Sequence, residues 1–245
     1  MNIQEALNLA SEIALLHPYL DFLREIARPA IELRASASPA IAHGSRFGGA
    51  PFVPPGFLWP QHEIGHYRFL GQFNLSDIEH HDLPLPANGL LSFFYVYDEE
   101  GTVMWHDEGY IKVFYWDDFA QFTLYEAGEH VHFNPEQSLE LVTGIYLPPK
   151  EELRTEWPFD AEAANEYFYY LVEKVNHYPH YLLGYPSYNT KGYDPTPGDD
   201  WQTLLNLGSD QALNWCWLDG RKLMLFIEKY CLRQGDFSRV QCDAG

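Results

Sequence analysis

Basic residues are scarce in this sequence. It holds 15 Lys and Arg against 35 Asp and Glu, which gives a formal net charge of −20 at pH 7. A surface this anionic repels the phosphate backbone of nucleic acids and the headgroups of anionic lipids. We therefore expect no nucleic-acid partner and no membrane partner.

Cysteines and long apolar runs are also scarce. The three cysteines form no Cys-x-x-Cys pair, which argues against a disulfide framework and a thiolate zinc site. No Lys or Arg precedes Arg24, and Glu5 and Glu12 interrupt the first apolar run, unlike a secretory signal. No stretch of roughly eighteen apolar residues follows that could span a membrane. These absences predict a protein of the reducing cytoplasm.

Motifs for nucleophilic catalysis and nucleotide binding are missing too, since the chain has no G-x-S-x-G, G-x-x-x-x-G-K-[ST] or G-x-G-x-x-G. The one catalytic pattern is H-E-x-x-H, formed by His62, Glu63 and His66. In zincins this spacing works on a helix, which brings both imidazoles to one zinc ion. Here Pro60 and Gly65 disfavour a helix, and strand-like residues follow. We therefore expect no enzyme activity, with a zinc hydrolase at these residues as a remote alternative.

Histidines elsewhere offer one further metal-binding arrangement. His130 and His132 stand at strand spacing, so both side chains would point to one face and could share an ion. Such histidines are more often surface or packing residues. We expect neither a bound metal nor a cofactor, and the sequence leaves open whether a His pair binds one.

Aromatic residues, by contrast, are abundant: 7 Trp, 17 Tyr and 16 Phe make up 16% of the chain. Short aromatic or β-branched segments recur about every ten residues between 67 and 147, including 130–133, and again at 201–207, 221–229 and 236–242. Apolar periodicity indicates helices within residues 1–28 and over about 160–175, the latter capped by Asp160. We predict an α+β fold that is mostly antiparallel β, roll-like or sandwich-like, in a single domain of residues 1–245. Its N-terminal helical segment spans 1–28, a first β unit 44–147 and a second β unit 181–242.

The two β units echo each other. Gly49-Ala50-Pro51 precedes a strand that ends in Asn74-Leu75, and Gly184-Tyr185-Pro186 precedes one that contains Asn206-Leu207. In both units a polar crossover and a Gly-started strand follow. This repetition predicts a pseudo-duplicated sheet. The alternative is that Gly-Pro turns and apolar strands recur by chance in a β protein.

Negative charge is concentrated in one third of the chain. Between Phe69 and Pro149 there are 14 acidic residues and a single basic one, Lys112. Clustered carboxylates accelerate encounter with a basic partner, and neighbouring aromatics supply contact area. The candidate partner-binding residues are the acids and aromatics of the densest stretch: Asp98, Glu99, Glu100, Trp105, Asp107, Glu108, Tyr110, Asp117 and Asp118. The alternative is a merely solubilising surface on polar turns.

Ordered short motifs from about residue 31 onward resemble the YwqG-like family of bacterial proteins, a domain of unknown function. The matching segments are 45–51, 59–60, 69–75, 83–84, 89–94, 113–115, 183–186, 201–205, 219–221 and 236–238. The resemblance implies a mostly β, roll-like fold and no transferable catalytic residues. It also implies a cytoplasmic immunity role, because such domains occur in bacterial toxin–immunity gene neighbourhoods. One departure is the stretch 205–210, which lacks a Gln that the family often has beside an acidic pair.

The resulting hypothesis is a non-enzymatic immunity protein that binds and neutralises a cognate toxin through an acidic aromatic surface. A nuclease is the favoured toxin, since its substrate-binding surface must be basic. A second hypothesis is a small-ligand or peptide-binding module. Its cleft would lie between the two β units, floored by Phe57, Trp59, Gln72 and Trp201.

Overall fold

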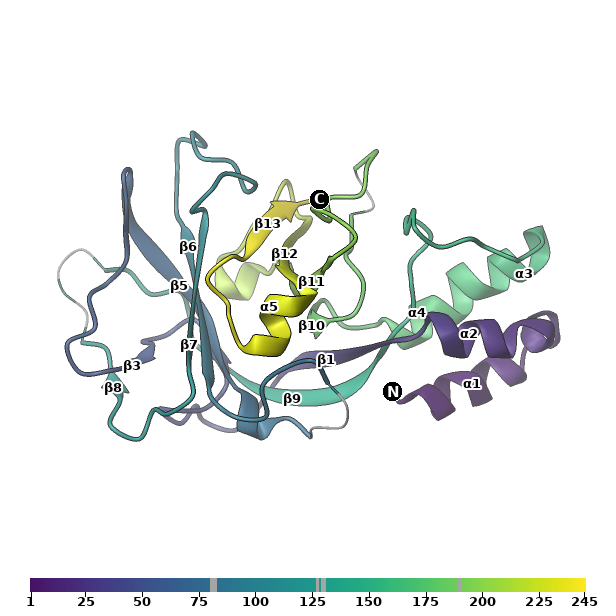
Figure 1. Cartoon of the computed structure of the whole chain (residues 1–245), viewed down its shortest axis with the longest axis horizontal. Helices are drawn as coiled ribbons and strands as arrows, with labels where there is room; N and C mark the ends of the chain where they lie inside the picture. Colours follow the sequence, from purple (N-terminus) through teal and green to yellow (C-terminus); the bar gives the residue numbers. More distant parts are fainter. Residues whose placement is uncertain (80–82, 127, 129–130, 189–190) are drawn as a thin grey trace.

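The computed structural model describes residues 1–79, 83–126, 128, 131–188 and 191–245. His130 therefore lies outside the described residues, and its predicted pairing with His132 with it. Six of the helical segments gather at one end of the molecule (Figure 1). They comprise α1 (Ile3–Ser11), the 3-10 helix η1 (Ala14–Tyr19), α2 (Leu20–Ile26), α3 (Ala161–Glu166), the π-helical turn η3 (Tyr167–Leu171) and α4 (Val172–Val175). The helices predicted within 1–28 and over 160–175 are thus confirmed.

Side-chain caps and one shared apolar cluster hold these helices together. Asn2 and Glu5 form a reciprocal capping box at the start of α1, and Asp160 accepts hydrogen bonds from two backbone amides of α3. Leu7, Leu23 and Leu171 belong to the same buried cluster. In the described part of the chain, no helix is both long and apolar enough to cross a bilayer.

Strands make up the rest of the architecture, and within the described residues eleven of them form one sheet. Their order is β13-β12-β11-β10-β1-β9-β2-β5-β6-β7, with β4 paired to β5; β3 and β8 form a separate pair. All pairings are antiparallel, which confirms the predicted fold class. The strands are β1 (Arg28–Ala35), β2 (Arg46–Phe47), β3 (Phe52–Val53), β4 (Gln61–His62), β5 (Gly65–Asn74), β6 (Leu90–Val96), β7 (Ile111–Trp116), β8 (Thr123–Leu124), β9 (Gln137–Tyr146), β10 (His180–Leu183), β11 (Trp201–Gly208), β12 (Lys222–Glu228) and β13 (Gln241–Ala244).

Some local predictions were wrong. Residues 131–133 form no strand, and the last predicted strand, 236–242, is paired only from Gln241 onward. The strand β10 and the helix α5 (Lys229–Gln234) were not predicted. Gly235 ends α5 in a left-handed conformation, with a φ of +68°. The glycine itself was the sequence signal for the end of this helix, because glycine adopts that conformation readily.

The sheet is a pseudo-duplication, as the repeated motifs predicted. One unit contributes β1, β2, β5, β6 and β7, and the other contributes β9, β10, β11, β12 and β13 in the same order. The two units exchange their first strands: β1 pairs with β10, β9 pairs with β2, and β1 and β9 pair with each other in the centre. Neither unit therefore has a complete sheet by itself.

Strand register shows which residues correspond in the two units. Arg46 pairs with Gln72 across β2 and β5, and Tyr181 pairs with Asn206 across β10 and β11. Both β5 and β11 carry a bulge two positions earlier in the strand, where the register shifts between Phe69 and Gly71 and between Thr203 and Leu205. Asn206 thus corresponds to Gln72, not to Asn74 as the sequence motif suggested, and each is followed by two further residues of its strand.

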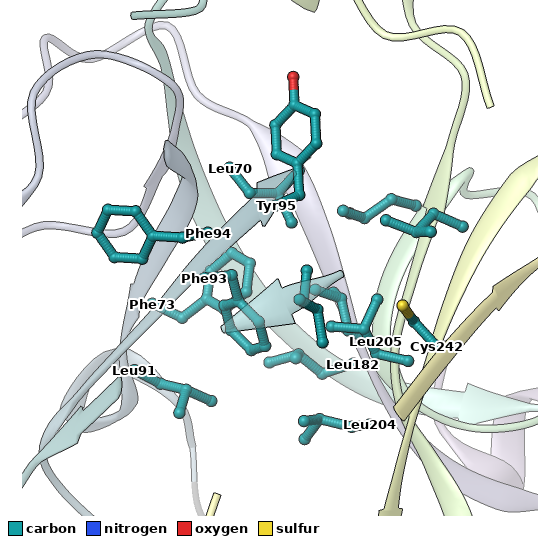
Figure 2. Close-up of a cluster of buried hydrophobic side chains, with 14 of the residues drawn as sticks. Leu70, Phe73, Leu91, Phe93, Phe94, Tyr95, Leu182, Leu204, Leu205 and Cys242 are labelled. Atoms are coloured by element: carbon teal, nitrogen blue, oxygen red, sulfur yellow. The ribbon is translucent and has the colours of Figure 1, made fainter. Parts of the chain in front are cut away.

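The core lies between the two halves of the sheet. Figure 2 shows Phe73, Leu91 and Phe93 from the first half facing Leu182, Leu204 and Leu205 from the second. The sheet curls until its edge strands, β7 and β13, face each other across a hollow lined by residues of 106–114 and 237–242. The sheet is thus a nearly closed barrel.

Candidate functional site

One end of the barrel carries a groove whose first wall is the loop between β6 and β7. Asp98 organises this loop, because its carboxylate accepts hydrogen bonds from the backbone amides of Glu100, Thr102 and Val103 and from the Thr102 hydroxyl. The Thr102 hydroxyl and the Val103 amide lower the pKa of Asp98 to about 2. The Asp98 carboxylate is therefore ionised at neutral pH, and its hydrogen bonds to backbone amides hold the loop in shape.

A second acid shapes the same loop. Asp107 accepts a hydrogen bond from the Met104 amide at 2.8 Å, and its carbonyl accepts one from the Tyr110 amide. The loop is also tied down from outside, since the Cys242 thiol donates to the Trp105 carbonyl and the Tyr67 hydroxyl donates to the Gly109 carbonyl. These contacts fix the first wall of the groove.

The second wall is the segment that follows β11. Asp210 caps a 3-10 turn, η4 (Gln211–Leu213), and bridges to Trp215 through backbone hydrogen bonds in both directions. The segment is strained, because Asn214, Leu218 and Asp219 all have positive φ values (57°, 36° and 54°). Strained non-glycine backbone clusters at ligand-contacting sites in proteins.

Between these walls lies a hollow of about 490 Å³, within the size range of ligand sites. Trp215 and Trp217 line it, are only 3% and 4% exposed, and have indole N–H groups with no hydrogen-bond partner among the described residues. An adjoining hollow of about 350 Å³ extends it along Ser209–Cys216. We call the two together the Trp groove.

The electrostatics of the Trp groove are one-sided. Asp98 and Asp210 line it, and Glu99, Glu100 and Glu108 are exposed on the loop of the first wall. None of its described lining residues is Lys or Arg. An anionic rim over an aromatic floor favours a cationic side chain, and the two indole N–H groups call for acceptors such as backbone carbonyls.

The structure brings together seven of the nine candidate partner-binding residues. Asp98, Glu99, Glu100, Trp105, Asp107, Glu108 and Tyr110 all belong to the β6–β7 loop. Tyr110 is 5% exposed, so it belongs to the floor, and burial raises its pKa. Asp117 and Asp118 follow the far end of β7, a six-residue strand about 20 Å long, and lie outside the groove.

Sequence reasoning missed the second wall. Trp215 and Trp217 flank Cys216, a pattern that in sequence is typical of a packed strand or turn rather than of a binding surface. Both tryptophans are indeed packed, Trp215 against Phe47 and Trp217 against Tyr95. The available signal was the Asn214 before them and the Leu218-Asp219-Gly220 after them, which suit tight turns.

The four residues proposed for an inter-unit cleft do not meet in one. Gln72 is fully buried and hydrogen-bonds the backbone at Ala42, Gly44 and Phe52. Phe57 and Trp59 pack with Phe94 and Tyr125. Trp201 packs instead beside a separate cluster of Tyr188, Met224 and Phe226.

The H-E-x-x-H residues form a hairpin rather than a helix. His62 ends β4 and pairs with Gly65 at the start of β5, so this segment lacks the helical i, i+4 geometry of a zincin. In the ranges that the structure describes, no group of three or more His, Cys, Asp and Glu side chains could hold a metal ion. All three cysteines are free thiols, with Cys216 exposed and Cys231 and Cys242 buried.

Comparison with known proteins places the chain in a family. A search of curated proteins gave no match. A family model described as "Domain of unknown function (DUF1963)" matches residues 45–244, which include the whole Trp groove and most of the sheet. On that match, the chain belongs to the DUF1963 family.

Proposed function

We propose that this protein is a cytoplasmic immunity protein of the YwqG-like kind, which binds a cognate secreted toxin and neutralises it without catalysis. The Trp groove is the proposed binding surface. The observation that carries the proposal is an exposed acidic loop beside a hollow lined by Trp215 and Trp217, whose indole N–H groups have no hydrogen-bond partner among the described residues. A basic loop of a partner would place its cationic side chains against this acidic rim and aromatic floor.

A nuclease is the favoured toxin because its substrate site must be basic. The net charge of −20 would steer such a partner toward this protein, and the exposed glutamates of the β6–β7 loop would set the final approach. Rim charges of this kind act mainly on the association rate and its dependence on salt.

The test is protection from the toxin encoded beside the gene, measured as growth on co-expression. A groove variant carries Glu99→Lys, Glu100→Lys and Glu108→Lys, all exposed positions. We expect it to lose protection and to bind the toxin at least about tenfold more slowly at low salt. Its melting temperature should match that of the unmodified protein, since these side chains pack against nothing in the core.

A matched control carries the same charge change at Glu12→Lys, Glu25→Lys and Glu173→Lys, in or beside helices at the other end of the molecule. The control should retain protection. Equal loss in both variants would attribute binding to net charge alone, and full protection by the groove variant would exclude the groove as the binding surface.

The runner-up is a peptide-binding module that uses the same groove. The specific observation in its favour is the 490 Å³ hollow itself, which is large enough for one or two side chains. This function would be favoured if a short Arg-rich peptide binds the unmodified protein but not the groove variant, and if the protein gives no protection from a toxin encoded beside its gene.

A further inference from the structure

The second half of the sheet ends in a hollow that the proposed function does not use. It lies where β1 and β11 begin and β10 and β12 end, at the opposite end of β11 from the Trp groove. Its volume is about 300 Å³. It is lined by Arg28, Pro29, Pro84, Leu183, Gly184, Gln202, Thr203 and Lys229.

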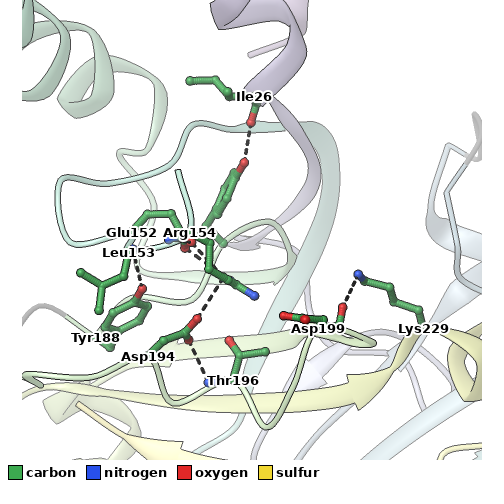
Figure 3. Close-up of polar contacts among 10 residues, drawn as sticks. Ile26, Glu152, Leu153, Arg154, Tyr188, Asp194, Thr196, Asp199 and Lys229 are labelled. Carbon is green, nitrogen blue, oxygen red and sulfur yellow. Dashed lines mark hydrogen bonds and ion pairs between the residues drawn. The ribbon is translucent and has the colours of Figure 1, made fainter. Parts of the chain in front are cut away.

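Two cations line this hollow, and no carboxylate is among its lining residues. Neither Arg28 nor Lys229 forms an ion pair with any residue that the structure describes. The contrast with nearby Arg154 is direct, because Figure 3 shows that cation held by both Glu152 and Asp194. In a chain with more than twice as many acids as bases, two cations converging without a carboxylate indicate a place for an external anion.

Both cations are held in position by neutral groups. The Arg28 guanidinium lies 3.8 Å from the centre of the Tyr185 ring, a stacking contact that leaves the edge of the guanidinium available. The Lys229 ammonium donates to the Asp199 carbonyl at 2.6 Å (Figure 3) and has further protons to donate. Their positions are therefore fixed while their charges remain uncompensated.

A buried hydroxyl adds an independent observation. Thr203 is 2% exposed, and its hydroxyl oxygen has no hydrogen-bond partner among the described residues. Gln202, the preceding residue of β11, pairs regularly with β12 and has its side chain on the opposite face of the strand, so it is not part of this donor set. A buried hydroxyl without a partner is costly, and a bound anion would remove that cost.

The backbone around the hollow is irregular on two sides. Thr203 stands at the bulge of β11, and Leu183 has a φ of +62°, an unusual conformation for leucine. In the first half of the sheet the position that corresponds to Thr203 is Phe69, which is fully buried. The donor-lined hollow is thus particular to the second half.

We propose that this hollow binds a small phosphate-bearing molecule. Three terminal oxygens and nearly two negative charges suit two cations and one hydroxyl, and the apolar part of the molecule would rest on Pro29, Pro84 and Leu183. This site is independent of the toxin-binding proposal, since it lies at the other end of the barrel.

The test uses inorganic phosphate, glycerol phosphate and succinate as probes, in calorimetric titrations at constant ionic strength. We expect saturable binding of both phosphates and weaker binding of succinate. Arg28→Gln should weaken phosphate binding at least about tenfold, and Thr203→Val about fivefold. Arg24→Gln, an equal charge change at an exposed residue paired with Asp21, should leave binding unchanged.

Measurements of thermal stability distinguish a phosphate site from a purely structural role of the same residues. Without phosphate, Thr203→Val should unfold at the same or a higher temperature, because it removes a hydroxyl without a partner. With phosphate, the unmodified protein should gain more thermal stability than this variant. Equal gains in all variants would identify a general salt effect and overturn the proposal, as would the absence of binding at about 10 mM phosphate, ten times a Kd of about 1 mM. Tighter binding of succinate than of either phosphate would overturn the assignment to phosphate.

Discussion

The two halves of the sheet perform the same local tasks with different side chains. In the first half Gln72 accepts a hydrogen bond from the Phe52 amide and donates to the carbonyls of Ala42 and Gly44. At the corresponding position Asn206 has only a long 3.5 Å contact to the Tyr185 carbonyl, and its own side-chain oxygen has no hydrogen-bond partner in the described part of the chain. Asparagine is one methylene shorter than glutamine. At this position the first half is therefore closed by side-chain hydrogen bonds, whereas in the second half the Asn206 oxygen is left without a partner among the described residues.

The loops that follow β2 and β10 are also held by different side chains in the two halves. Arg46 donates to the carbonyls of Ile41, Ala42 and Ala50, while the corresponding Tyr181 donates to the Tyr185 carbonyl. Ala50 and Tyr185 both stand before the proline of the repeated Gly-x-Pro motif. A long cation and a phenol thus hold the same turn, but the cation holds a further loop as well.

The largest difference between the halves should appear when these two residues are truncated. Arg46→Met removes a buried guanidinium that donates to three backbone carbonyls, so we expect it to lower the free energy of unfolding by about 3–5 kcal/mol. Tyr181→Phe removes one 2.8 Å hydrogen bond and should cost about 1–2 kcal/mol. Urea unfolding followed by tryptophan fluorescence measures both. Equal losses would mean that the two halves depend on this contact alike.

A smaller effect tests the glycine turn. Gly48 has a φ of +56°, and a Cβ there would lie 2.1 Å from the Pro135 carbonyl oxygen, whereas the corresponding Leu183 accommodates a whole side chain at a φ of +62°. Gly48→Ala should therefore cost about 2–4 kcal/mol. Gly101→Ala has a similar φ of +66° with no atom within 4 Å of its Cβ, and as a control it should cost about 1 kcal/mol. Thermal unfolding that ranked the two variants equally would show that conformation, not contact, limits this position.

The smallest effect sharpens the comparison through pH. Ser45 in the first half corresponds to His180, the first residue of β10, in the second half. The Ser45 hydroxyl donates a hydrogen bond to Asp77, and Nε2 of His180 lies 3.6 Å from a carboxylate oxygen of Asp210. Burial lowers the pKa of His180 below its ordinary 6.5, against an opposing effect of Asp210. The unfolded chain then binds the proton more readily, so the stability that His180 contributes is complete above pH 6.5 and is lost as the pH falls below it.

The measurement is the free energy of unfolding of the unmodified protein and of His180→Gln between pH 7.5 and pH 5. We expect the unmodified protein to lose more stability than the variant across this interval, since the carboxylates are common to both. Parallel pH profiles would show that His180 titrates alike in the folded and unfolded chains.

Sequence reasoning succeeded where a pattern is local. The apolar stripe of Leu7 and Ala10, the cap at Asp160 and the glycine–proline motifs all depend on neighbours a few residues away, and the structure confirms the elements they predicted. It failed where partners are distant. Trp215 faces the β6–β7 loop, more than a hundred residues earlier in the chain, and only the fold brings them to one groove.

Charge density along the sequence was informative but too coarse for the same reason. It found the acidic β6–β7 loop, yet it grouped Asp117 and Asp118 with that loop although β7 carries them away from it. It also could not show that the carboxylates of Asp98 and Asp107 accept hydrogen bonds from backbone amides of their own loop. What remains exposed at the groove is the smaller set of Glu99, Glu100 and Glu108.

The exchange of first strands between the units has a practical consequence. A chain cut in the segment between β9 and β10 would give two pieces, the first ending with β9, which pairs with both β1 and β2. The second piece would begin at β10 and would lack β1, the neighbour on which β10 is aligned. We expect the second piece not to form its native sheet alone, and the two pieces to reassemble into the native topology when they are mixed. This makes the fold a suitable starting point for fragment complementation.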